Sequence, residues 1–201
     1  MLTITNEDNM KLMSRYEDNY FDLAIVDPPY GLGERIYSGG TKKCKFQTLF
    51  NENKWDDSTP DKDYFIELFR VSKHQIIWGG NYFDLPPTRT VVCWDKKKGD
   101  NNFSMWEMAW TSFDKPAKIY RQSSSGNRIH PTQKPVRLYE WLLKKYAQEG
   151  DKILDTHLGS GSIAIACHNL HFDLTACELD KDYFDSAMKR IKQHQQQLRI
   201  F

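Results

Sequence analysis

Short apolar runs and polar turns alternate along this chain. The run DLAIV (22–26) ends at two prolines, which cannot continue a hydrogen-bonded ladder, so it predicts a buried strand. Five later runs have strand-like length and composition. These are HQIIWGGN (74–81), TVVCW (90–94), MAWTSF (108–113), KILD (152–155) and DLTACEL (173–179).

Helical patterns separate several of these runs. Residues 61–73 place apolar side chains at helical spacing behind a Thr59–Pro60 start signal, and residues 135–150 have proline at the start and glycine past the end. A glycine turn opens a small-residue helix at 159–170, and residues 181–197 predict a long charged helix. Alternating strands and helices predict an α/β domain with a mostly parallel, doubly wound, Rossmann-like sheet.

Two segments lack such periodicity. Residues 31–59 contain GLG, SGG and STP and predict a long loop, which in a small domain is usually functional or disordered. Residues 121–131 (RQSSSGNRIHP) have the composition of a flexible linker. We expect one domain over 1–201, with halves at 1–120 and 130–201.

Composition narrows the class of protein. With 201 residues, 39% hydrophobic and 13% aromatic, the chain can bury a real core. Its mean hydropathy is −0.70, and neither a membrane span nor a signal peptide is evident, so we expect a cytoplasmic protein with no membrane partner. Cysteines at 44, 93, 167 and 177 form no CxxC pair and predict reduced thiols rather than zinc ligands or disulfides.

The net charge of +1 conceals a segregation of charge. Residues 35–54, 89–98 and 118–137 carry +4, +3 and +5, which leaves the rest of the chain strongly acidic. A segregated basic face can bind phosphates locally, although chance clustering in solvated loops would give the same counts.

A glycine turn follows the predicted strand at 152–155. The segment DTHLGSG (155–161) leads into a helix, where glycines allow close backbone approach and helix amides attract negative groups. Glu178 ends the next strand, 23 residues after Asp155, at a distance typical of an acid that accepts hydrogen bonds from ribose hydroxyls. The combination favours a nucleoside cofactor over a tight turn with a solvated acid.

The motif Asp27-Pro28-Pro29-Tyr30 follows the strand at 22–26. The prolines stiffen the backbone and leave carbonyl acceptors beside a carboxylate and an aromatic ring. Asp27 and the Pro28 carbonyl could accept both hydrogens of an exocyclic amine while Tyr30 stacks on the base. The alternative is a simple turn.

DPPY, together with LDTHLGSGS and HPTQKP, resembles the amino-methyltransferases that use S-adenosylmethionine to methylate DNA bases. The order of the motifs is similar to that of the permuted, beta-type adenine-N6 enzymes, and the resemblance runs from ITNEDNMKLM to ACELD. It implies a catalytic half (1–120), a cofactor half (130–201), S-adenosylmethionine as the cofactor with S-adenosylhomocysteine as its product, DNA as the partner, and no metal.

The resemblance assigns roles to residues of this chain. It places Asp27, Pro28, Pro29 and Tyr30 in the catalytic motif and Asn81 of WGGNYF near the base pocket. It assigns the cofactor to Asp8, Thr132, Gln133, Lys134, Asp155, His157, Gly159, Ser160, Gly161 and Glu178, with Asp27 adjoining. Charge suggests further DNA contacts at Lys42, Lys43, Lys45 and Arg128.

The chain departs from the family pattern twice. Thr156-His157 replaces the usual Pro-Phe, so the expected ring contact with the cofactor would come from His157. Only RQSSSGNR stands where relatives usually insert a target-recognition region, so DNA reading would be weak, or come from residues 31–59 or from a second subunit in a homodimer.

Three rival interpretations remain. One is the same chemistry on cytosine-N4 or on RNA, although cytosine enzymes more often have serine at the position of Asp27. Another is a non-catalytic module that keeps the fold. The last is a nicotinamide oxidoreductase, but Ala164 interrupts the GxGxxG pattern that it requires.

Overall fold

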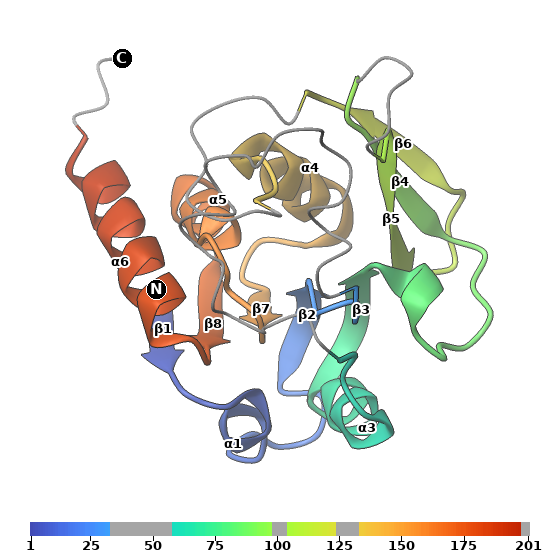
Figure 1. The fold of residues 1–201 in the computed structure, drawn as a ribbon, viewed down its shortest axis with the longest axis horizontal. Helices are drawn as coiled ribbons and strands as arrows, with labels where there is room; N and C mark the ends of the chain where they lie inside the picture. The colour runs from blue at the N-terminus through green and yellow to red at the C-terminus, as the bar shows by residue number, and fades with distance from the viewer. Residues whose placement is uncertain (33–57, 98–103, 124–132, 198–201) are drawn as a thin grey trace.

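The computed structural model describes residues 1–32, 58–97, 104–123 and 133–197. One eight-stranded sheet, in the order β1-β8-β7-β2-β3-β5-β4-β6, takes strands from both halves of the chain (Figure 1). Its strands are β1 (Leu2–Asn6), β2 (Phe21–Val26), β3 (Ser72–Trp78), β4 (Val91–Asp95), β5 (Trp106–Thr111), β6 (Lys118–Arg121), β7 (Lys152–Asp155) and β8 (Asp173–Glu178). The first five strands in spatial order pair in parallel, and β5 pairs antiparallel with both β3 and β4. The predicted mostly parallel α/β sheet is confirmed.

Helices cover both faces of the sheet. These helices are α1 (Asn9–Met13), α3 (Lys62–Val71), α4 (Val136–Tyr146), α5 (Ser162–Leu170) and α6 (Lys181–Gln196), with a short 3-10 helix, η2 (Gly80–Tyr82). Leu23 and Ile25 of β2 pack in a cluster with α4, α5 and α6, whereas Ala24 and Val26 pack with α1 and α3. In Figure 1, α4 and α5 lie together on the side of the sheet opposite α1 and α3. The sheet is therefore doubly wound, as predicted.

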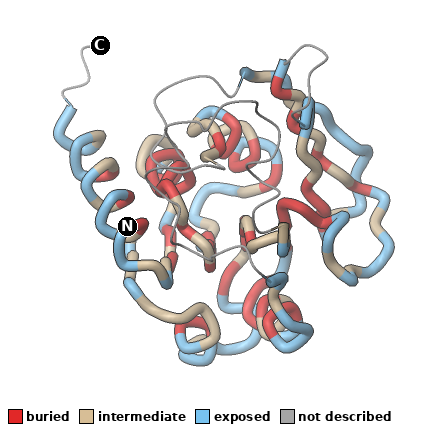
Figure 2. The backbone as a smooth tube through the Cα atoms, viewed as in Figure 1, coloured by how far each residue is buried: buried red, intermediate tan, exposed pale blue. Residues whose placement is uncertain are grey.

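Apolar residues on both faces explain why the central strands read as continuous apolar runs rather than alternating ones. Leu23, Ala24, Ile25 and Val26 are each at most 1% exposed. Figure 2 shows the same contrast in the helices, with α5 largely buried and α6 exposed along one side. The small side chains of α5, noted in the sequence, let this helix pack closely between the sheet and α4.

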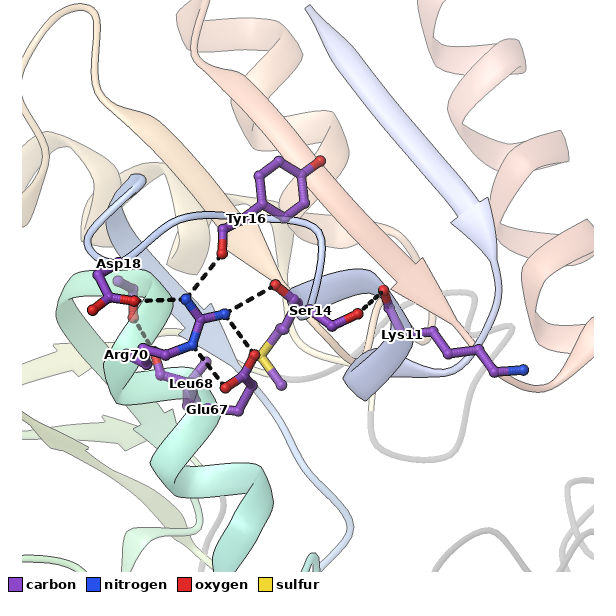
Figure 3. Close-up of polar contacts among 9 residues, drawn as sticks. Lys11, Ser14, Tyr16, Asp18, Glu67, Leu68 and Arg70 are labelled. Carbon is purple, nitrogen blue, oxygen red and sulfur yellow. Dashed lines mark hydrogen bonds and ion pairs between the residues drawn. The ribbon is translucent and has the colours of Figure 1, made fainter.

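The end of α3 is tied to the connection between α1 and β2. The guanidinium of Arg70 donates to Glu67, to Asp18 at 2.7 Å, and to the carbonyl of Tyr16 at 3.0 Å (Figure 3). This fan of five donors fits a surface crossing of two chain segments. It fixes the segment that leads into β2 and hence into the DPPY motif.

Several sequence-based boundaries need correction. The structure adds β1, α1 and β6, none of which was predicted, and Arg121 belongs to β6 rather than to a linker. Ser72 begins β3 instead of ending the preceding helix, because its hydroxyl donates to the carbonyl of Leu68 and its backbone is extended. The strand predicted at 74–81 stops at Trp78, since Gly79 adopts a left-handed φ of 70°.

Other predictions fall partly outside the described residues. Most of the 31–59 loop and of the 121–131 linker lies there, as do Thr132, Arg128 and the lysines at 42, 43 and 45. Cys93, Cys167 and Cys177 are free thiols, and Cys44 lies outside the described residues. Across the described ranges, no helix has the length and apolar character to cross a membrane.

Candidate active site

The carboxyl ends of neighbouring strands bring the predicted site residues to one edge of the sheet. Asp27 follows β2, Asp155 ends β7, Glu178 ends β8, Asp8 follows β1, and Gly79 follows β3. In open parallel sheets this edge is where ligands bind. The chain reaches the edge from positions as far apart as Asp8 and Glu178, so the sheet topology, rather than sequence proximity, assembles the site.

Asp27 lies in a hydrogen-bonded set with a tyrosine and a lysine. Its Oδ1 accepts from the hydroxyl of Tyr30 at 2.6 Å, and its Oδ2 accepts from Nζ of Lys134 at 2.5 Å. The Lys134 side chain is only 1% exposed. Although burial opposes it, the charges of Asp27 and Glu107 raise the pKa of Lys134, so this buried ammonium stays protonated.

Glu107 is a member of this set that the sequence analysis missed. It is the second residue of β5, whose antiparallel pairing with β3 brings residue 107 beyond Trp78, at the same edge of the sheet. Lys96, directly after β4, lies 2.5 Å from Glu107 Oε1, and Lys134 lies 3.2 Å from Oε2. Burial alone would favour the neutral acid, but the two lysines lower the pKa of Glu107. The only sequence signal for Glu107 is its position directly before the predicted strand MAWTSF, where an alternating strand pattern could be extended to include it.

The Tyr30 ring packs against Gly79 and the residues that follow it. A Cβ built on Gly79 would lie 2.2 Å from Cε1 of Tyr30, so the ring packs directly on the glycine backbone. The Tyr82 ring stacks on Tyr30 with centroids 4.9 Å apart and an angle of 11°. Asn81, predicted near a base pocket, is exposed on η2 beside Tyr82. The WGGNYF segment therefore does pack against the DPPY motif.

The glycine turn and Glu178 meet on the other side of β7. The backbone N–H of Gly159 donates to Glu178 Oε2 at 2.8 Å, and that of Asp180 donates to Oε1 at 3.0 Å. Gly159 and Gly161 have φ values of 51° and 71°, which residues other than glycine rarely adopt. Gly161 has a packing role, since an added Cβ would lie 3.0 Å from Ile191 of α6. Ser160 is buried and bonds to the hydroxyl of Ser162.

Asp155 is a buried acid without a cation in direct contact among the described residues. It is 3% exposed, and its Oδ1 accepts from the backbone N–H of His157 at 3.0 Å. Burial, together with the charges of Asp27 and Glu178, raises the pKa of Asp155 to about 8. Burial also raises the pKa of Glu178. A positively charged ligand bound at this part of the edge would stabilise the ionised forms of Asp155 and Glu178.

His157 lies between the turn and α1. Asn9 of α1 contacts its Nε2 at 3.2 Å, and Thr156 contacts its Nδ1 at 3.0 Å. Its ring meets Tyr64 edge to face, with centroids 5.3 Å apart. Burial lowers the pKa of His157 to about 4, so the ring is neutral at physiological pH. A neutral flat ring fits the replacement of phenylalanine expected from the sequence.

The remaining predicted cofactor residues lie at the start of α1 and just before α4. Asp8 caps α1 by accepting from the backbone N–H of Lys11, and it lies close enough to His157 and Cys177 for its charge to act on both. Gln133 is half-buried beside Lys134, and Lys134 itself turns to Asp27 rather than to the glycine turn. In the described ranges, no group of three or more histidine, cysteine or acidic side chains could hold a metal ion.

Comparison with known proteins gives a consistent match. A family model described as DNA methylase, for N6 and N4 enzymes, matches residues 77–189. The type II methyltransferase M2.DpnII of Streptococcus pneumoniae is 25% identical over 163 residues, which are 81% of this chain and 56% of that protein. M.HpaI of Haemophilus parainfluenzae is 29% identical over 94 residues, 47% of this chain and 27% of that protein. The chain thus spans about half or less of these relatives.

Solved structures show the same fold. The M1.HpyAVI–SAM complex superposes with a TM-score of 0.63 at 19% identity, covering 95% of this chain and 99% of that one. PvuII DNA methyltransferase, described as cytosine-N4-specific, superposes with a TM-score of 0.60 at 12% identity, covering 96% and 92%.

Proposed function

The chain belongs to the N6/N4 DNA methylase family, and from that premise we propose that it transfers a methyl group from S-adenosylmethionine to the N6 amine of adenine in DNA. The observation that carries the proposal is the arrangement around Asp27. One carboxylate, a rigid proline backbone and a tyrosine ring seated on Gly79 lie at the ligand-binding edge of the sheet. These are acceptors and an aromatic ring suited to a flat base that carries an amine, with the base taking the place of the Tyr82 ring that stacks on Tyr30.

The residues around the glycine turn fit the cofactor. S-adenosylmethionine supplies an electrophilic methyl group on a positively charged sulfur, next to an adenosine with ribose hydroxyls. Burial, with a smaller contribution from the charges of Asp27 and Glu178, raises the pKa of Asp155, and a cationic ligand would favour its ionised form. Glu178 and Asp8 supply acceptors for hydroxyl and amine groups, and His157 supplies a neutral ring. We assign the cofactor to these residues and to the backbone of the turn.

The amine of adenine is a weak nucleophile, because its lone pair is delocalised into the ring. Hydrogen bonds from the amine to Asp27 and to the Pro28 carbonyl would localise that pair on nitrogen and aim it at the methyl carbon. The nitrogen pair forms the new N–C bond, the pair of the broken S–C bond stays on sulfur, and nitrogen loses one proton to Asp27 or to water. No covalent link to the protein is required.

DNA binding is assigned to the basic segments that flank the site. Residues 35–54 and 118–137 carry +4 and +5, and much of both lies outside the described residues. Phosphate contacts from Lys42, Lys43, Lys45 and Arg128 would supply affinity without reading sequence. A second subunit would add further contacts, and we include a homodimer in the proposal on that ground.

The fold also accommodates cytosine-N4 chemistry, since PvuII methyltransferase shares it. The deciding experiment incubates the protein with DNA and methyl-labelled S-adenosylmethionine, digests the DNA, and identifies the labelled nucleoside by mass. We expect N6-methyldeoxyadenosine. Label in N4-methyldeoxycytidine would transfer the proposal to cytosine. A parallel reaction with RNA in place of DNA completes the test: label in RNA alone would exclude DNA as the substrate, and no transfer to either would refute the proposed activity.

A further inference from the structure

A chain of four charged side chains runs through the catalytic edge of the sheet. Lys96 pairs with Glu107, Glu107 pairs with Lys134, and Lys134 pairs with Asp27. The side chains of Lys134 and Lys96 are 1% and 11% exposed. A charged side chain that is buried to this extent is stable only when an opposite charge lies close to it. Breaking any ion pair in this row of four side chains would therefore cost considerable free energy.

The ammonium of Lys134 lies within the catalytic motif itself. Its Nζ is 2.5 Å from Asp27 Oδ2, 3.5 Å from the hydroxyl of Tyr30 and 5.0 Å from the centre of the Trp78 ring. Lys134 Nζ thus donates to Asp27 and lies near Tyr30. These are the two side chains that hold the substrate amine and its base in the proposed function. Asp27 Oδ1 is already accepting from Tyr30. An amine that approaches Oδ2 along the lone pair that Lys134 uses would therefore take the place of Lys134.

Glu107 is arranged to receive the displaced ammonium. Its Oε1 is held by Lys96, whereas its buried Oε2 makes no hydrogen bond within the described residues and lies 3.2 Å from Lys134 Nζ. A small shift would turn this ion pair into a full hydrogen bond while Lys134 leaves Asp27. The ammonium would then never lose carboxylate contact, which avoids leaving a buried charge unpaired.

We propose that Lys134 is a stand-in for the substrate amine on Asp27, and that Glu107 is the positioning residue to which Lys134 moves when the base enters. The inference rests on the proposed function. It gives the site a selection rule, because only a base that offers N–H donors can replace an ammonium on Asp27. A base with a carbonyl at that position, such as thymine or guanine, would set an acceptor against the carboxylate and leave Lys134 in place.

The test compares two oligonucleotides that differ by one amine. The first is a sequence that the wild-type protein methylates, and the second replaces its target adenine by purine, which lacks the 6-amine. In Glu107→Gln the charge that attracts Lys134 is lost. We expect the adenine oligonucleotide to bind roughly ten- to a hundredfold more weakly, the purine oligonucleotide to bind unchanged, and KM to rise while kcat at saturation is kept.

A matched control and a double variant separate this role from a structural one. Glu140→Gln removes a carboxylate on α4 that accepts a hydrogen bond from Asn169, and it should leave the affinity for both oligonucleotides unchanged. Lys134→Met removes the stand-in, so the preference for adenine over purine should increase, and adding Glu107→Gln to it should have little further effect. If Glu107→Gln fails to fold, as judged by thermal melting, the Lys134→Met preference alone decides.

Three results would overturn the inference. They are an equal loss of both oligonucleotides in Glu107→Gln, a full Glu107→Gln effect in the Lys134→Met background, or an unchanged preference in Lys134→Met. Each can occur while the wild-type protein still methylates adenine. Failure of the proposed function is a different result, namely no labelled base with the wild-type protein.

Discussion

Two groups of acids at the same sheet edge have opposite electrostatic settings. Asp27 and Glu107 are neutralised by lysines of the chain itself, and the pKa of Glu107 is lowered. Asp155 and Glu178 are held only by backbone N–H groups among the contacts described, and their pKa values are raised. The first group is balanced before any ligand arrives, whereas the second gains most from a ligand that is itself a cation. Under the proposed function, the first group would meet the substrate amine and the second the sulfonium of the cofactor.

The largest expected effect comes from the amine side. Asp27→Ala should lower methyl transfer by at least about a hundredfold, because the acceptor that orients the amine is lost. Affinity for S-adenosylmethionine, measured by calorimetry, should stay near that of the wild type, since Lys134 keeps Glu107 as a partner. A parallel loss of cofactor binding would place Asp27 in the cofactor pocket and erase the contrast between the two groups.

The corresponding change on the cofactor side is Glu178→Ala. Loss of a charged acceptor should weaken S-adenosylmethionine binding by roughly 1–3 kcal/mol, with kcat at saturating cofactor largely kept. Glu178→Gln is the intermediate variant, because it keeps an acceptor for only one of the N–H groups of Gly159 and Asp180, which bond to different oxygens of Glu178. Calorimetric titration of both variants measures the effect. If the alanine variant binds the cofactor as tightly as the wild type does, Glu178 only shapes the turn.

Gly79→Ala tests whether the ring at the amine site is seated by the glycine. The new Cβ would collide with Tyr30, so kcat/KM for DNA should fall by about tenfold while cofactor affinity is kept. Gly150→Ala is matched in backbone strain, with a φ of 89° and nothing within 4 Å of its Cβ. Gly150→Ala should lose about 1 kcal/mol of unfolding free energy through backbone strain alone, and Gly79→Ala should lose more, because its Cβ also displaces the Tyr30 ring. Equal activity in the two variants would show that Tyr30 adapts.

The smallest expected effect is a pH dependence. Asp155 is mainly protonated at pH 7 because its pKa is about 8, and only the ionised form attracts a cation. Affinity for S-adenosylmethionine should therefore rise with pH, by at most about tenfold per unit, and level off above pH 8. Calorimetry in buffers of different ionisation enthalpy should show proton release on binding at pH 7. Asp155→Asn should remove both the slope and the release, and a slope retained in that variant would assign the proton to another group.

The sequence carried most of the central fold. Buried strands such as residues 22–26 are apolar on both faces, and helices such as 181–197 repeat at helical spacing, so local patterns predict both. The short elements β1, α1 and β6 escaped because they gain stability from partners far along the chain. For example, β1 pairs with β8, from Leu2 with Leu174 to Asn6 with Glu178. Four or five residues carry too little pattern to identify such elements alone.

The candidate site divides in the same way. DPPY, the glycine turn and Glu178 could be proposed from sequence because stiff prolines, positive φ angles and an acid at the end of a strand are locally encoded. Glu107 and Lys96 were not found, because an ion pair between residues of two antiparallel strands depends on register. The turn of Lys134 toward Asp27, 107 positions away, was likewise decided by tertiary packing. A buried charge takes whichever opposite charge the fold brings near, and no sequence spacing specifies that partner.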